Sequence, residues 1–404
     1  MPASLLRVLN NPLMLIFTLL SVGNFVYGLR LGRDGWQQRA TMLAEPLRPG
    51  EKRWAESAAI LLAVPLGVAI HEFCHALATW LFGGQIVEFG YFFYWGYVVP
   101  VGNFSPAQDW FISLAGTLGT LAYGVGLWLL LRHHRSSLGR YFGVRALRFH
   151  LYYALIYYPL FTLFTFVGDW RVIYDFALTP TLSGLTLGVH LLLLTGFFVY
   201  DRRGWFEMPG FTTPAGAQTF QLVQQQLALN PDDLLKQEQY IDVLRQAGAP
   251  NQAREQLRHL LRHHPDLPEG YLLQASLLAH GKRQPPVKAV RAAEKALALG
   301  LSRPGQVAYA NSLLAQYNLD TGRVDEALRQ LNEALAQTAQ SAMPNQAYLY
   351  YLRATAHRRK QQYAAARQDI EQALLLAEGP GREEAVAFYR REQETIASHA
   401  RHTP

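Results

Sequence analysis

The chain has 404 residues, of which 50% are apolar, and a net charge of +7. A chain of this length exceeds what one compact core usually holds, so we expect at least two domains. Its single cysteine, Cys74, excludes an intramolecular disulfide. The basic residues of the first half flank apolar runs and form no tracts with interleaved aromatic residues, so we expect no nucleic-acid binding and attribute the charge to membrane anchoring.

Five stretches of the first half are long and apolar enough to cross a bilayer, which takes about 17 to 25 helical residues. They lie at residues 12–29, 57–82, 108–131, 149–168 and 182–200. The first starts late for a cleavable signal peptide and has no small-residue cleavage site after it, although it could lie in the membrane interface. The fourth contains Pro159, so we expect a kink or a polar cavity there. The sequence thus predicts a multi-pass protein of the cell or inner membrane, in contact with the lipid bilayer.

The link between the second and third spans, residues 83–107, is rich in aromatic and β-branched residues and has no Lys or Arg. This pattern predicts one or two short strands, whose backbone a hairpin or a bound peptide would satisfy. The two neighbouring links carry eleven basic residues, namely Arg30, Arg33, Arg39, Arg48, Lys52, Arg53, Arg132, Arg135, Arg140, Arg145 and Arg148. Links rich in basic residues face the cytoplasm, so we place both of these links there. With five spans in total, the C-terminal half would then be cytoplasmic too.

The second half repeats. Four segments align through Ala253, Ala289, Ala327 and Ala366, at spacings of 36, 38 and 39 residues, and each follows another helical segment. They predict helix-turn-helix units of the tetratricopeptide type, whose usual period is about 34 residues, with a capping helix at 381–400. Stacked units of this kind form an α-helical solenoid with a concave face that suits a protein partner.

We therefore expect a mainly α-helical protein with three parts. Residues 1–203 form a polytopic transmembrane helical bundle of about five spans with a short membrane-proximal β segment. Residues 204–216 form a linker, and residues 217–404 form the tetratricopeptide-like solenoid.

The stretch AIHEFCHALA, residues 69–78, places ionisable groups inside the second apolar span. His71 and His75 are four residues apart and project from one helical face, as two imidazoles must to hold one zinc ion. Glu72 lies about 100° around the helix, where it could take a proton from a water molecule that zinc activates. The alternative is a chance match without function, but each buried ionisable group costs roughly 2.5–3.5 kcal/mol in an apolar span. We therefore predict a zinc site for amide hydrolysis and expect Cys74 to be a packing residue.

A catalytic zinc ion usually has three protein ligands. Asp169, at the end of the fourth apolar stretch, is the preferred third ligand, although capping a helix end or pairing with Arg171 would also explain it. Asp175 is the next candidate and lies nearer the expected interface. Asp109 suits the first turn of a helix. His190, alone in the fifth span, suits a packing position.

The third span contains Gly116, Thr120 and Gly124, a seam of small residues that lets another helix approach closely. Three motifs follow one another in the chain: HEFCH in the second span, SLAGTLGTLAYG in the third and the Asp169 segment in a later one. This order matches that of the motifs in the site-2 protease family of intramembrane zinc metalloproteases. The chain resembles this family over roughly residues 57–180. The family's third motif usually reads N-x-x-P followed by Leu-Asp-Gly, and its second motif has a proline. This chain has Gly168-Asp169-Trp170 and lacks that proline, so it resembles a divergent branch.

The resemblance implies a zinc endopeptidase that cleaves a membrane-embedded helix of another protein, as in regulated intramembrane proteolysis. It implies His71, His75 and Asp169 as zinc ligands, Glu72 as the catalytic base, and a strand within residues 84–98 that receives the substrate. The competing hypothesis is a membrane scaffold that only binds partners through its repeats. The intact Glu72 favours the enzyme, because a structural metal site has no use for a general base.

Overall fold

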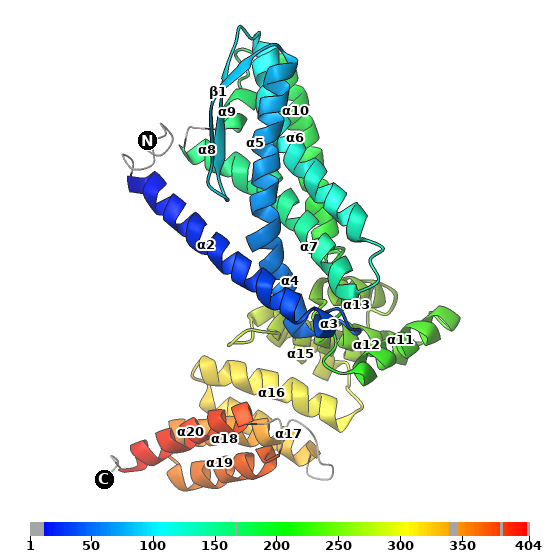
Figure 1. The fold of residues 1–404 in the computed structure, drawn as a ribbon. Coiled ribbons are helices and arrows are strands. Elements are labelled where there is room, and N and C mark those ends of the chain that lie inside the picture. The colour runs from blue at the N-terminus through cyan, green and yellow to red at the C-terminus, as the bar shows by residue number, and fades with distance from the viewer. Residues whose placement is uncertain (1–11, 166–167, 339–345, 380–382, 402–404) are drawn as a thin grey trace. The chain divides into compact units, whose positions relative to one another are not determined.

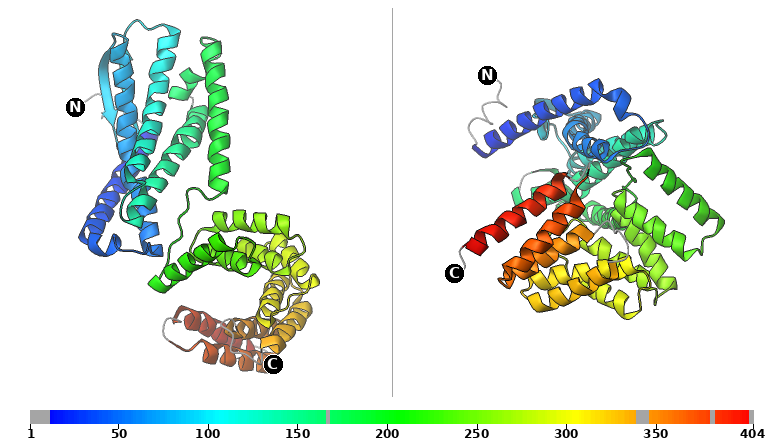
Figure 2. Two further views of the ribbon diagram at one scale, coloured as in Figure 1. Left: turned by 90° about the vertical axis from the view of Figure 1, so that its right-hand side faces the viewer. Right: turned by 90° about the horizontal axis from the view of Figure 1, so that it is seen from below.

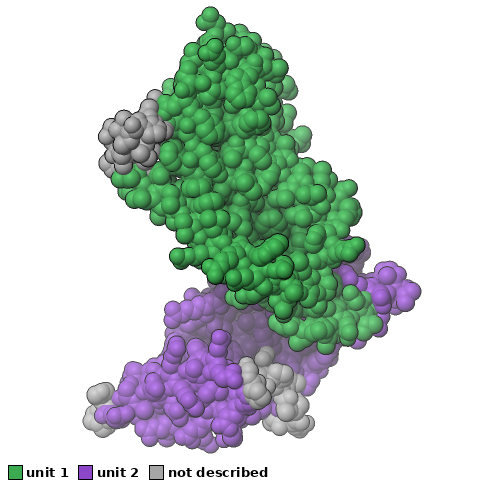
Figure 3. Space-filling view, in the orientation of Figure 1, with its two compact units in different colours: residues 1–222, 246–252 green, residues 223–245, 253–404 purple. Residues whose placement is uncertain are grey.

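The computed structural model describes residues 12–165, 168–338, 346–379 and 383–401 and is mainly helical (Figure 1). Contacts divide the chain into two compact units, coloured separately in Figure 3. The membrane unit comprises Met1–Leu222 and Gln246–Gln252, and the repeat unit comprises Val223–Arg245 and Ala253–Pro404. Each unit is described by itself.

Among the described residues of the membrane unit, four helical stretches are long and apolar enough to cross a bilayer. They are Leu15–Gln37, Pro49–Leu81, Pro106–Leu131 and Pro180–Arg202. The elements that build them are α2 (Pro12–Gln37), α4 (Pro49–Ala58), η1 (Ala59–Ala63), α5 (Val64–Leu81), α6 (Pro106–Leu131) and α10 (Pro180–Arg202). The stretch 149–168, expected as a span, instead continues α7 (Ser137–Tyr152) through η2 (Tyr153–Tyr157) into α8 (Tyr158–Thr165). The four apolar helices suit a membrane, while the multi-pass topology and a fifth span stay predictions.

Pro65 explains the π-helical segment η1 that precedes α5. Proline has no N–H, so Pro65 cannot bond the carbonyl of Leu61, four residues earlier, and the regular helix is interrupted. The hydroxyl of Tyr94 donates to the Leu61 oxygen over 3.1 Å, and that of Tyr91 donates to the Pro65 oxygen over 2.8 Å. Two tyrosines near the strands therefore satisfy carbonyl groups of the helix that carries HEFCH.

Pro159 has the same effect on η2, the interruption expected in the fourth stretch. It cannot bond the carbonyl of Leu155, and Nε2 of His190 in α10 donates to that oxygen over 2.7 Å. The other nitrogen of His190, Nδ1, is bonded to the hydroxyl of Tyr174. His190 thus has partners at both nitrogens, as expected for a histidine in a packing position.

The predicted strands form a hairpin of β1 (Gln85–Tyr91) and β2 (Gly96–Val101), paired antiparallel with an irregularity between Ile86 and Glu88. The hairpin packs against α5, beside which it lies in Figure 1. At its tip, Phe93 has a φ of 65° and stacks on Phe25 of α2 with ring centroids 3.9 Å apart. In this link, which has no Lys or Arg, one edge of each strand is therefore paired within a hairpin of the chain itself.

The repeat unit consists of successive antiparallel helices. They are α12 (Leu234–Gln246), α13 (Pro250–His263), α14 (Pro268–Ala279), α15 (Val287–Ala298), α16 (Pro304–Asp320), α17 (Val324–Thr338), α18 (Gln346–Arg359), α19 (Tyr363–Ala377) and α20 (Glu383–Arg401), preceded by α11 (Pro214–Leu229). Figure 2 shows them stacked side by side in chain order. The aligned alanines lie in α13, α15, α17 and α19, and all four, Ala253, Ala289, Ala327 and Ala366, are fully buried. The expected helical pairs and the final helix are present, and their tetratricopeptide type stays a prediction.

The turn of residues 246–252 belongs to the membrane unit and is held there by two opposite charges. The ammonium group of Lys52, in α4, donates to the carbonyl of Gly248 over 2.8 Å, just after the C-terminus of α12. The carboxylate of Glu207 accepts the backbone N–H of Gln252 over 3.1 Å, in the first turn of α13. These two contacts hold the turn within the membrane unit.

Candidate metal centre

Helix α5 presents the two histidines and the glutamate of the HEFCH motif to the interior of the membrane unit. His71, Glu72 and His75 have exposed fractions of only 5%, 6% and 7%. The two histidines are one helical turn apart, and their rings meet edge to face with centroids 4.6 Å apart. Three ionisable side chains are therefore buried together on one helix, where each needs a partner.

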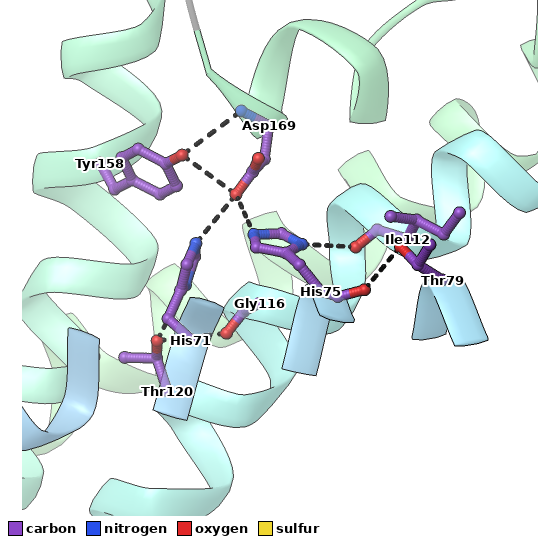
Figure 4. Close-up of polar contacts among 8 residues, drawn as sticks. All are labelled: His71, His75, Thr79, Ile112, Gly116, Thr120, Tyr158 and Asp169. Carbon is purple, nitrogen blue, oxygen red and sulfur yellow. Dashed lines mark hydrogen bonds and ion pairs between the residues drawn. The ribbon is translucent and has the colours of Figure 1, made fainter. Parts of the chain in front are cut away.

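Helix α6 binds the Nδ1 atoms of both histidines (Figure 4). Nδ1 of His75 lies 2.7 Å from the carbonyl oxygen of Ile112, to which it must donate. Nδ1 of His71 lies 3.1 Å from the hydroxyl oxygen of Thr120, and that hydroxyl donates its own hydrogen to the carbonyl of Gly116. Both Nδ1 atoms thus act as donors, which leaves both Nε2 atoms as the lone-pair positions that bind metals.

Asp169 comes from a third element, the short helix α9 (Asp169–Ile173). Its Oδ2 atom lies 2.9 Å from Nε2 of His71 and 3.0 Å from Nε2 of His75. The three ligand atoms all lie within 4.8 Å of one another. Atoms bound to one zinc ion at about 2.0–2.2 Å in tetrahedral geometry lie roughly 3.3 Å apart, so a small displacement would suffice. Two imidazoles and one carboxylate also form a donor set that catalytic zinc sites use.

Gly116 makes room for this cluster. A Cβ atom at this position would lie 2.3 Å from Nε2 of His75 and 2.6 Å from Nε2 of His71. Three residues further, a Cβ at Gly119 would lie 2.5 Å from the sulfur of Cys74, so this thiol packs against α6. Gly124 instead adjoins His150 of α7. Of the small residues on α6, Gly116 and Thr120 therefore lie against the histidines of the cluster, whereas Gly124 lies against another helix.

The two other aspartates considered from the sequence lie outside the cluster. The carboxylate of Asp175 accepts the backbone N–H groups of Ala177 and Leu178, both over 3.0 Å, and so closes a turn. Asp109 lies in the first turn of α6, four residues after the N-cap residue Ser105, as its sequence position predicts.

Glu72 faces the hairpin. A Cβ on Gly96, the first residue of β2, would lie 2.8 Å from Cγ of Glu72 and 3.0 Å from its Oε1. Within the part of the chain that the structure describes, the Glu72 carboxylate has no hydrogen-bond partner. A buried acid without a structural bond is thus placed between the histidine helix and a strand.

Tyr158, the first residue of α8, also contacts the cluster and was not among the residues predicted from the sequence. Its hydroxyl donates to Oδ2 of Asp169 over 3.0 Å, and its ring meets the His71 ring edge to face at 5.3 Å. The only signal was the run of tyrosines around Pro159, which gives no direction to any one of them.

We predict that Asp169→Ala strongly weakens zinc binding, because two imidazoles alone leave the ion one protein ligand short. Removing an outer hydrogen-bond partner of a metal ligand typically lowers metal affinity by about 10–100-fold. Removing the ligand itself should lower zinc affinity by more than that. Metal analysis of purified protein after dialysis checks this. Asp175→Ala and Asp109→Ala are controls that should keep their zinc. Stoichiometric zinc in Asp169→Ala would place the third ligand elsewhere.

We also predict that Gly116→Ala abolishes zinc binding, because the added methyl group would occupy the space beside both Nε2 atoms. Gly126→Ala is the matched control on the same helix, since a Cβ there meets nothing within 4 Å. Both substitutions raise helix propensity by about 1 kcal/mol, so a difference between them reports the site. Equal zinc content in the two variants would show that Gly116 does not limit the metal site.

Two comparisons with known proteins give no family for this site. No protein-family model matches the chain, and the search of curated proteins returns no match. What the cluster can do is therefore inferred from its own residues.

Proposed function

We propose that the protein is a multi-pass membrane zinc metalloendopeptidase of the site-2 protease type that hydrolyses peptide bonds of membrane-embedded protein segments. The observation that carries this proposal is the convergence of His71, His75 and Asp169 from two separate helices, with Glu72 beside them. Such a group in an apolar helix is costly unless it has a function.

The residues divide the chemical work between them. A zinc ion held by His71, His75 and Asp169 would act as a Lewis acid and activate water. Glu72 is the group available to take a proton from the attacking water and pass it to the leaving amine, since no described hydrogen bond engages its carboxylate. A purely structural site would not need this carboxylate.

The hairpin supports an extended substrate. β1 and β2 pair only with each other among the described strands, so each has an unpaired edge, and Gly96 brings β2 next to Glu72. A peptide added to a strand edge gains main-chain hydrogen bonds and is held in the extended form that a hydrolase can attack. We therefore propose an unwound segment of a membrane-spanning helix as the substrate.

A second function, partner binding by the repeat unit, is favoured by a groove of about 500 Å³ among α12, α14 and α16. Its lining includes Leu272, Tyr309 and the acid Glu238. Burial, with the neighbouring Glu269, raises the pKa of Glu238 to about 7, although Arg303 opposes the shift. An apolar and charged groove of this kind suits a protein segment. In a scaffold, binding at this groove would be the protein's only function. In the protease, the groove would recruit a substrate or partner.

For the topology, we propose that the repeat unit is cytoplasmic and that residues 149–168 cross the membrane as a fifth span, between the basic 132–148 link and the candidate span Pro180–Arg202. Eleven basic residues lie in the two links that flank the second and third spans on one side, and the 83–107 link between them has none. In the site-2 proteases that the chain resembles, the link after the HExxH span faces the cytoplasm, which is the opposite orientation. A reporter enzyme fused after Pro404 should be active only in the cytoplasm, and activity only outside it would reverse the assignment.

Glu72→Gln should abolish cleavage and leave zinc bound, because glutamine keeps the shape of the side chain and cannot accept the proton. We expect a loss of at least about 100-fold in turnover, the lower end for general acid–base catalysis. The assay combines the zinc content of the purified protein with cleavage of a panel of single-span membrane proteins in liposomes. Equal turnover in variant and wild type would remove the protease hypothesis, and a wild type that binds zinc but cleaves nothing would favour the scaffold.

A further inference from the structure

Tyr158 makes two hydrogen bonds to Asp169, and neither is needed to explain the packing of its ring (Figure 4). Its hydroxyl donates to Oδ2 of Asp169 over 3.0 Å and accepts the backbone N–H of Asp169 over 3.4 Å. Oδ2 is the same oxygen that lies against Nε2 of both histidines. One phenol therefore bonds both the backbone and the side chain of the expected third ligand.

The position of Tyr158 depends on the interruption of its helix. A π-helical turn contains one residue more than an α-helical turn, so the segment after η2 is rotated by about 100° relative to a regular helix. Pro159 imposes the interruption, and His190 bonds the carbonyl that it frees. The tyrosine directly after this turn is the one whose ring lies against His71, with an interplanar angle of 79°.

A hydrogen bond to a ligand carboxylate limits how it can rotate. Without an outside partner, the Asp169 carboxylate could turn either oxygen, or both, toward the histidines. Donation by Tyr158 to Oδ2 fixes which oxygen faces them. Outer partners of this kind orient metal ligands, and their loss typically costs about 10–100-fold in metal affinity.

We propose that Tyr158 is a positioning residue of the metal centre, whose hydroxyl holds the Asp169 carboxylate in the orientation that completes the site with His71 and His75. The role rests on the zinc site of the proposed function and is independent of proteolysis. The alternative is that Tyr158 only fills space against His71, which its ring would do without the hydroxyl.

Tyr158→Phe separates the two roles, because it removes the hydroxyl and keeps the ring. The matched control is Tyr157→Phe, at the neighbouring position, where the side chain is 47% exposed and its hydroxyl has no hydrogen bond to a described residue. Zinc affinity of the full-length protein in detergent is measured by competition with a chromophoric chelator, and thermal unfolding by circular dichroism confirms that each variant is folded. We expect about 10–100-fold weaker zinc binding for Tyr158→Phe and an unchanged affinity for Tyr157→Phe.

A double-mutant cycle tests whether Tyr158 acts through Asp169. In the Asp169→Ala background, Tyr158→Phe should cause no further loss of zinc affinity, and the visible spectrum of the cobalt-substituted protein should change in Tyr158→Phe but not in Tyr157→Phe. Wild-type affinity in Tyr158→Phe, or an equal loss in both backgrounds, would overturn the inference. A wild-type protein that binds zinc but cleaves no substrate defeats the protease proposal and leaves this role intact, whereas a wild type without zinc affinity defeats both.

Discussion

The packing around α5 depends on the need of the four ring nitrogens of His71 and His75 for polar partners. Each is a polar group deep in an apolar bundle, where an unpaired donor or acceptor costs several kcal/mol. Both Nδ1 atoms bond to α6, through Thr120 and the Ile112 carbonyl, and both Nε2 atoms face Oδ2 of Asp169, so each contact of these nitrogens lies outside α5. α6 must therefore lie very close to α5, and Gly116 is the residue that allows it.

The same requirement explains the two proline interruptions. Pro65 and Pro159 each free a carbonyl group four residues earlier in an apolar helix, and Tyr94 and His190 each donate a hydrogen bond to it. Tyr94 belongs to the hairpin and His190 to α10, so the two bonds tie these elements to the helices that carry the site. Each interruption thus becomes a point of attachment: one bond ties the hairpin to the helix that carries Glu72, and the other ties α10 to the helical segment that precedes Tyr158.

Local spacing predicted some of these features and could not have predicted others. The i, i+4 histidines, the hairpin and the buried alanines of the repeats result from helix and strand periodicity, which the sequence displays directly. The partners of His71 are 49 and 98 residues away in sequence, and only packing brings them close. Asp169 and Asp175 are only six residues apart, and both were considered as the third ligand. The structure distinguishes them, because the carboxylate of Asp175 accepts backbone N–H groups of its own turn, whereas that of Asp169 faces the histidines. The run of tyrosines around Pro159 did not single out Tyr158, because the π-helical turn decides which of them lies against His71.

Gly168, directly before Asp169, contributes to this arrangement through its backbone conformation. Its φ of 126° is accessible to glycine and costly for residues with a side chain, and a Cβ there would lie 2.8 Å from Oγ1 of Thr162 and 3.3 Å from the hydroxyl of Tyr158. A larger residue would therefore both strain the chain before Asp169 and crowd the hydroxyl that bonds it. The positive φ of Gly168 and the Tyr158 contact therefore act together on Asp169, whose Oδ2 atom meets the hydroxyl of Tyr158 and Nε2 of both histidines.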